Sequence, residues 1–243
     1  MNNRPLYKQI KDEIVCGLVR KEWQPGEMLP SEKQLAARFA VGVSTIRAAL
    51  SELASAGVLL RAQGKGTFVS HHNSRGNAYR FFNVVRNTGE KEPFHRELLS
   101  LRKERASVSV AARLQLTGGR RTSEIYRLRI RLNATYPAFA CAQIVVPAHL
   151  FPGLDAKVVP DGPSSLYALY QARYGVNIVQ VDESVYSVRA GTMVGRILGI
   201  DPSEPVLQVD RVGFTFNAMP VELRTTWVHT ERYHYHTTQG AAG

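Results

Sequence analysis

The sequence predicts an α+β protein built from two units, and three observations lead to that prediction. The first 70 residues carry apolar side chains at helical spacing, interrupted by short turns. From about residue 96 the pattern changes to strands separated by turns, with short helices between them. A chain of 243 residues has room for two units, since domains of roughly 100–150 residues are commonest. We therefore expect a helical N-terminal domain at 1–70, a linker at 71–91, and a C-terminal domain at 92–243 with a mainly antiparallel sheet and helices.

The composition is that of an ordinary globular protein, with 44% hydrophobic and 21% charged residues. No apolar run approaches the ~20 residues that cross a bilayer, and the first residues lead into an amphipathic segment instead of a signal-peptide core. We therefore expect a cytoplasmic protein that does not contact membranes. The formal net charge of +11 favours a polyanionic partner, because Lys and Arg side chains that neutralise phosphates release condensed counterions.

The cysteines and histidines do not form a recognisable metal or redox motif. Cys16 and Cys141 fall in different predicted domains, so we expect two buried, unpaired thiols. His229, His234 and His236 lie near the C-terminus, but a metal site needs a further convergent ligand. We expect neither a metal nor a cofactor.

Two helices are expected in the first 40 residues. The first begins at Pro5, and its apolar residues Leu6, Ile10, Ile14 and Leu18 recur every four positions on one stripe. Gly17 and then the pair at 25–26 are expected to end it. The second begins at Ser31, whose side chain can cap the amide of Gln34 while Gln34 reaches back, and it runs to about Phe39.

A third helix and a β-hairpin follow. The helix is expected to begin near Ser44, with Ser44, Thr45 and Arg47 on its exposed face. Its buried face is expected to carry Ile46, Ala49, Leu50 and Leu53. Gly57 ends it, and short strands at 58–61 and 67–69 flank a turn at 63–66. Helix, helix, tight turn, helix and hairpin is the order of a winged helix-turn-helix.

That order predicts which side chains would contact DNA. A recognition helix enters the major groove with its first turns foremost, which places Ser44, Thr45 and Arg47 near base edges. Gly64 and Gly66 would let the wing approach the backbone closely, and Lys65 between them would add a positive charge. Arg38 would contact phosphate beside the groove. The alternative is a small helical interaction module with solvated basic residues.

Four sequence blocks resemble the DNA-binding domain of GntR-family regulators, in order and with matching spacing. They are Pro5-Leu6-Tyr7-Lys8-Gln9-Ile10, Pro25-Gly26-Glu27-Met28-Leu29-Pro30-Ser31-Glu32, Thr45-Ile46-Arg47-Ala48-Ala49-Leu50 and Gly64-Lys65-Gly66-Thr67-Phe68-Val69. The resemblance implies DNA contacts at Arg38, Thr45, Arg47 and the Gly64–Gly66 turn. The chain departs from the family at Gly42 and Val43, where a Ser-Arg pair is usual, so it lacks an arginine that family members use on DNA.

The C-terminal region reads as strands with two helices. At 125–132 the residues alternate, with Arg127, Arg129 and Arg131 on one strand face. An apolar strand is expected at 139–146, and further strands at 178–188, 206–216 and 221–228. Helices are expected at 165–173 and 192–198, ended by Gly175 and Gly199.

This succession resembles the UTRA effector-binding domain of the HutC branch of the GntR family. The matching pieces are Arg127-Leu128-Arg129, Leu150-Phe151-Pro152-Gly153-Leu154, Ser165-Leu166-Tyr167, Pro205-Val206-Leu207 with Arg211, and Pro220-Val221-Glu222. The resemblance implies a chorismate-lyase-like fold that binds a small effector. Ala142 stands where many members carry a glutamate, which argues against an amino-sugar ligand.

The chemistry of the side chains suggests an anionic effector. Arginine forks bind carboxylate or phosphate, and serines at a helix start add hydroxyls and free amides. The expected pocket comprises Arg127, Arg129, Ser164, Ser165, Glu222 and Arg224. In the alternative interpretation, the arginines are a solvated strand face and Glu222 and Arg224 pair with charges on neighbouring strands.

The sequence therefore predicts a sequence-specific DNA-binding transcriptional regulator, a repressor, whose operator binding a small anionic metabolite modulates. A homodimer would offer two recognition helices to a palindromic operator. Two alternatives are an enzyme with a chorismate-lyase-like domain and a sequence-indifferent architectural DNA-binding protein. The sequence contains no legible catalytic Ser/His/Asp set or phosphate-cradling loop, which argues against an enzyme.

Overall fold

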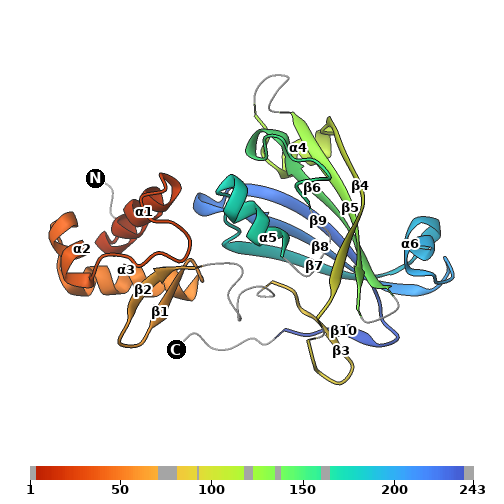
Figure 1. Cartoon of the computed structure of the whole chain (residues 1–243), viewed down its shortest axis with the longest axis horizontal. Helices are drawn as coiled ribbons and strands as arrows, with labels where there is room; N and C mark the ends of the chain where they lie inside the picture. The colour runs from red at the N-terminus through yellow and green to blue at the C-terminus, as the bar shows by residue number, and fades with distance from the viewer. Residues whose placement is uncertain are drawn as a thin grey trace.

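The computed structural model describes residues 4–70, 81–91, 93–117, 123–134, 138–159 and 165–237. A helical domain with a β-hairpin lies beside a larger domain built on one sheet (Figure 1). Within the described residues, no helix is long and apolar enough to cross a membrane. The predicted α+β class and the order of the two domains are confirmed.

The N-terminal domain contains three helices and a hairpin. These are α1 (Leu6–Val19), α2 (Glu32–Phe39), α3 (Val43–Ser55), β1 (Leu59–Ala62) and β2 (Gly66–Val69). The predicted capping box at the start of α2 is present, with Ser31 and Gln34 bonded to each other's backbone amides. Apolar faces of the three helices meet around Ile14, Leu35 and Ile46, which are fully buried. The helices are thus fixed by a shared core as well as by their local signals.

Gly17 does not end the first helix, which continues to Val19. A Cβ atom added at Gly17 would lie 2.5 Å from the indole of Trp23. Trp23 is buried in the core of the domain, so the glycine provides space for its ring. The prediction that Gly17 acts as a helix stop was wrong because a packing requirement in the tertiary structure explains this glycine instead.

A six-stranded antiparallel sheet forms the C-terminal domain, in the order β4-β5-β6-β9-β8-β7. Its strands are β4 (His95–Arg105), β5 (Glu124–Asn133), β6 (Ala138–Pro147), β7 (Gln180–Arg189), β8 (Pro205–Phe214) and β9 (Pro220–His229). The strand β4 and the helix α4 (Val108–Arg113) were not predicted from the sequence. The other five strands lie where the sequence analysis predicted strands, to within a few residues.

Different elements cover the two faces of this sheet. The first face, here called the α5 face, contains Leu128, Ile144 and Arg224, which lie opposite one another on β5, β6 and β9. It packs against η1 (Ala148–Leu150), α5 (Leu166–Leu169) and the π-helical turn η2 (Tyr170–Tyr174). The second face, here called the α4–α6 face, packs against α4 and α6 (Gly191–Leu198).

Part of the predicted linker belongs to the C-terminal domain. Strand β3 (Val84–Arg86) pairs antiparallel with β10 (Tyr233–Tyr235), about 150 residues later in the chain. Val84 packs in the main core of the sheet domain. Residues 71–80 of the predicted linker lie outside the described residues. The linker predicted at 71–91 from its polar composition is therefore too long at its C-terminal end.

The predicted helix at 165–173 consists of two parts with different hydrogen bonding. Helix α5 is followed directly by η2, and Gly175 ends the segment with a left-handed backbone (φ +69°). The amide of Val176 donates to the carbonyl of Tyr170, which closes the end of the turn. The predicted helix at 192–198 is α6, which Gly199 ends in the same way.

Candidate DNA interface and effector site

Helix α3 presents a polar face to solvent. Ile46, Ala49 and Leu50 are buried against α1 and α2, and this orientation leaves Ser44 and Arg47 exposed and Thr45 half-buried. The structure thus brings the three predicted base-reading residues together on the first turns of one exposed helix face. Their contact with DNA stays a prediction.

The wing is a tight hairpin whose tip fits the predicted role. Gly64 and Gly66 have φ values of +72° and +120°, which L-residues with side chains rarely adopt. Lys65 stands exposed between them. The residues from Arg61 to Thr67 line one side of an open groove, and Ser31, Glu32 and Gln34 at the start of α2 line the other.

Glu32 and Arg61 were not predicted, yet they hold Arg47 in place. Arg47 donates to one Glu32 carboxylate oxygen from Nε at 3.1 Å and from Nη2 at 2.9 Å. Arg61 lies 3.6 Å from the other oxygen and donates to the Arg47 carbonyl at 3.2 Å. The hydrogen bonds that Arg47 donates to Glu32 raise the pKa of Arg47. One carboxylate therefore sits between two cations on the face expected to meet DNA.

Arg38, and the pair at 42–43 where the chain departs from the family, are the remaining predicted features of this surface. Arg38 pairs with Glu22 at 2.7 Å, and its guanidinium lies 5.3 Å from the centre of the Trp23 ring. Gly42 is the N-cap of α3 and supplies no side-chain cap. Val43, where the family usually has arginine, packs partly against the domain core. Apolar contact has thus replaced a cation at the start of the recognition helix.

In the C-terminal domain, the predicted pocket residues lie on opposite faces of the sheet. Arg127 stands opposite Val145, which stands opposite Leu223, so Arg127 and Arg129 belong to the α4–α6 face. Glu222 and Arg224 belong to the α5 face. Ser165 caps α5 by accepting from the Tyr167 amide at 3.2 Å, and Ser164 lies outside the described residues. The expectation that Arg127 and Arg129 share one pocket with Glu222 and Arg224 was therefore wrong, because the sheet lies between the two pairs.

The arginines of the α4–α6 face are mostly paired along the strands. Arg127 donates to Glu104 at 2.6 Å and Arg131 to Glu97 at 2.6 Å, both on the neighbouring strand β4. Arg129 lies between them, and its buried Nε has no hydrogen-bond partner among the described residues. Arg127 therefore lies on a strand face where it is paired with a carboxylate of the neighbouring strand.

Four charged side chains and two tyrosines converge on the α5 face. We call this group the Glu222 cluster; it comprises Tyr167, Tyr170, Glu183, Arg211, Glu222 and Arg224. Glu222 is fully buried and accepts from the hydroxyls of Tyr167 at 2.8 Å and Tyr170 at 2.9 Å. Arg224 donates to it from Nε at 3.0 Å and Nη2 at 2.9 Å. The carboxylate therefore has partners on both α5–η2 and β9.

A second ion pair extends the cluster. Arg211 donates to Glu183 at 2.7 Å, to the Tyr167 hydroxyl at 3.2 Å and to the carbonyl of Phe81. Glu183 also accepts from Tyr235 and from Asn83. None of the cluster residues Tyr167, Glu183, Arg211 or Tyr170 was singled out as a site residue by sequence; Arg211 and Tyr167 appeared only in the family motifs.

Burial and charge act in opposite directions on Glu222. Burial raises the pKa of its carboxyl, but Arg224, the Tyr167 hydroxyl and the charge of Arg211 more than offset that, so the pKa lies below its ordinary value. Burial, and then the charge of Glu222, raise the pKa values of Tyr167 and Tyr170. Glu222 is therefore ionised at neutral pH, and the tyrosines are hydrogen-bond donors. Such a set can bind ligand hydroxyls or amines through carboxylates and an anionic group through guanidinium.

Comparison with known families accounts for most of the chain. Residues 6–69 match the model of bacterial regulatory proteins of the GntR family, and residues 91–234 match the UTRA domain. The chain is 29% identical over 237 residues to the uncharacterised HTH-type transcriptional regulator YurK of Bacillus subtilis, covering 95% of this chain and 94% of YurK. It is 26% identical over 234 residues to the probable fructoselysine utilization operon repressor of Escherichia coli, covering 93% and 91%.

Solved structures agree with this assignment. The ligand-binding domain of a protein described as a GntR-family regulator, from Bordetella bronchiseptica, has a TM-score of 0.61 at 27% identity and covers 67% of this chain and 99% of that domain. PhnF from Mycobacterium smegmatis has the same fold, with a TM-score of 0.56 at 20% identity over 96% of this chain and 99% of PhnF. The protein belongs to the UTRA-domain family and is a DNA-binding transcriptional regulator of the GntR type.

Proposed function

We propose that the protein is a repressor that binds its operator as a homodimer in the cytoplasm and responds to a small anionic metabolite held at the Glu222 cluster. The observation that supports this site most strongly is that four charged side chains, each at most 15% exposed, lie together on one face of the C-terminal domain, from here on called the sensor domain. Even when they are paired, buried charges often stabilise a fold no more than well-packed apolar residues of similar volume would, so stability alone gives little reason for these two ion pairs. A ligand-binding site, by contrast, needs such charged side chains to contact a polar ligand.

The names of relatives support a small polar effector. They include a probable fructoselysine utilization repressor and a mannosyl-D-glycerate transport and metabolism repressor, both of Escherichia coli. In this chain Ala142, on the α5 face opposite Thr226, has no carboxylate to offer a ligand amine. Arg224 and Arg211 remain the groups suited to a carboxylate or phosphate.

A matched pair of arginine variants tests which face binds the ligand. Thermal unfolding of the protein is followed with a panel of sugar phosphates, sugar acids and amino acids, since a ligand that binds only the folded state raises its stability. Arg224→Gln should abolish the shift that a hit produces in the wild-type protein. Arg129→Gln, on the opposite face, should retain it. Loss of the shift in Arg129→Gln with its retention in Arg224→Gln would place the ligand on the α4–α6 face.

Three further measurements test the rest of the proposal. Footprinting on the protein's own upstream region should show a discrete protected site that the metabolite weakens, whereas uniform protection would indicate an architectural binder. Sedimentation should give a dimer. Incubation with the metabolite should yield no product, whereas turnover would favour an enzyme.

A further inference from the structure

We propose that the segment α5–η2, together with Phe216, links the Glu222 cluster to the DNA-binding domain. Through this link, the state of the cluster governs whether that domain stays docked on the sensor domain. The inference rests on the proposed ligand site and adds a route by which that site controls DNA binding.

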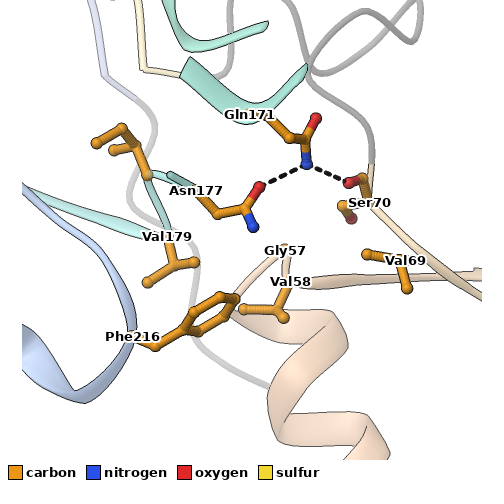
Figure 2. Close-up of a pocket in the computed structure, with 9 residues that line it drawn as sticks. Gly57, Val58, Val69, Ser70, Gln171, Asn177, Val179 and Phe216 are labelled. Carbon is orange, nitrogen blue, oxygen red and sulfur yellow. Dashed lines mark hydrogen bonds between the residues drawn. The ribbon is translucent and has the colours of Figure 1, made fainter. Parts of the chain in front are cut away.

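The first contact of the link is apolar. Phe216, in the short turn η3 (Phe216–Ala218) between β8 and β9, is 9% exposed and belongs to the core of the DNA-binding domain. Its ring lies beside Val58, and Val179 of the sensor domain lies next to it (Figure 2). The gap between these surfaces and Val69 has a volume of only about 10 Å³. A side chain of one domain therefore completes the core of the other.

The second contact is polar and directly follows the wing. Gln171 is 6% exposed, and its Nε2 donates to the carbonyl of Ser70 at 2.9 Å and to Oδ1 of Asn177 at 2.6 Å (Figure 2). Ser70 comes directly after β2, and its amide donates to Val58 at 2.9 Å. The side chain of Gln171 thus holds the chain at the base of the wing.

One turn of helix carries both the cluster contact and the docking contact. Tyr170 binds the Glu222 carboxylate through its hydroxyl, and the next residue, Gln171, binds Ser70. Both residues are buried, so a closely packed environment limits the independent movement of either. A ligand that competes for Glu222 or repositions Tyr170 would therefore be expected to move Gln171.

The geometry of this turn supports a switching role. Residues 170–174 form a π-helical turn. Such turns are rare in proteins, and those that occur are often found at functional sites. At its end, Gly175 approaches the side chain of Lys21, which follows α1 of the DNA-binding domain: a Cβ at Gly175 would lie 3.2 Å from Cε of Lys21. The same turn therefore contacts the DNA-binding domain at both of its ends. A ligand shifts such docking only as far as it favours one state over the other.

Hydrogen exchange of the full-length protein tests the link without a ligand. Peptides within 57–70 report docking, and peptides within α3 report the DNA-binding domain itself. Phe216→Ala and Gln171→Met should each accelerate exchange within 57–70 by roughly tenfold or more, while the interior of α3 stays protected. Unchanged protection within 57–70 in both variants would overturn the docking contact.

A pair of tyrosine variants tests the connection to the cluster. Tyr170→Phe removes only the hydroxyl that binds Glu222 and should change exchange within 57–70 by at least about threefold, although among the described residues this hydroxyl bonds Glu222 and not the DNA-binding domain. Tyr174→Phe removes a hydroxyl of the same turn that has no partner among the described residues, and it should leave 57–70 unchanged. Equal exchange in Tyr170→Phe and the wild-type protein would overturn the link.

Failure of the link can be distinguished from failure of the proposed function. If an identified metabolite stabilises the protein but leaves exchange within 57–70 unchanged, the ligand site stands and the link is refuted. If no metabolite stabilises the wild-type protein while Tyr170→Phe still alters exchange within 57–70, the link stands and the proposed ligand site fails.

Discussion

Replacing Glu32 with glutamine tests whether this carboxylate limits the attraction of the recognition surface for DNA. Glu32 lies 2.9 Å from Arg47 and 3.6 Å from Arg61, on the groove between α2 and the wing. Glu32→Gln keeps the size of the side chain and removes one negative charge. Because Arg47 is 61% exposed, its ion pair is screened by solvent, and we expect little change in the midpoint of thermal unfolding.

The effect on DNA affinity follows from counterion release. If Arg47 and Arg61 neutralise phosphates, removing the competing carboxylate adds up to about one effective phosphate contact, which steepens the slope of log K against log salt by about 0.9. Raising KCl from about 50 to about 200 mM should then reduce the affinity of the variant about 3.5-fold more than that of the wild-type protein.

Fluorescence anisotropy with a random-sequence duplex at several KCl concentrations measures both slopes. Glu13→Gln is the matched control, because Glu13 is an exposed carboxylate on α1, the helix that packs against the buried side of α3. Its slope should stay close to the wild-type value. Equal slopes for Glu32→Gln and Glu13→Gln would show that Glu32 does not offset the two arginines, and the assignment of this groove to DNA would lose its support.

Three other substitutions and one thiol-labelling experiment have expected outcomes. Arg47→Ala should reduce the preference for the operator over random DNA by roughly 5- to 150-fold in competition binding, while leaving any ligand-induced thermal shift intact. Loss of both would argue that the domains are not separable. Gly42→Ser should add the missing N-cap of α3 and stabilise the protein by a few tenths of a kcal/mol in urea unfolding, because Gly42 already has an extended backbone; no gain would mean that the hydroxyl does not reach the helix amides. Glu222→Gln should destabilise the protein by about 3–5 kcal/mol at pH 7, because it leaves Arg224 buried without a carboxylate. The pKa of Glu222 is lowered in the folded state, so its stabilisation is present above the ordinary value of 4.5 and is lost as pH falls through the folded pKa. The difference in urea stability between wild type and variant should therefore shrink below about pH 4.5, and a constant difference would contradict the ionised assignment. Burial raises the pKa of the Cys141 thiol to about 12, so Ellman's reagent at pH 8 should modify it only after unfolding.

Local signals in the sequence sufficed for most of the secondary structure and for the exposed face of α3. The capping residues Ser31 and Gln34 set the start of α2 because their hydrogen bonds span three residues. The helical spacing of Ile46 and Leu50 determined which side of α3 is buried, and hence that Arg47 is exposed. Each of these features depends on residues within one or two turns, so the sequence contains the necessary information locally.

The tertiary structure alone decided on which face of the sheet each candidate effector residue lies and how the two domains contact each other. Alternation showed that Arg127 and Arg129 share a strand face, as do Glu222 and Arg224, but strand pairing determined that the two pairs point to opposite sides of the sheet. Glu32 meets Arg47, and Gln171 meets Ser70, across 15 and 101 positions of the chain. Such contacts arise only when separate elements pack together, because no short-range pattern specifies the register of one strand, or the docking of one helix, against a distant part of the chain.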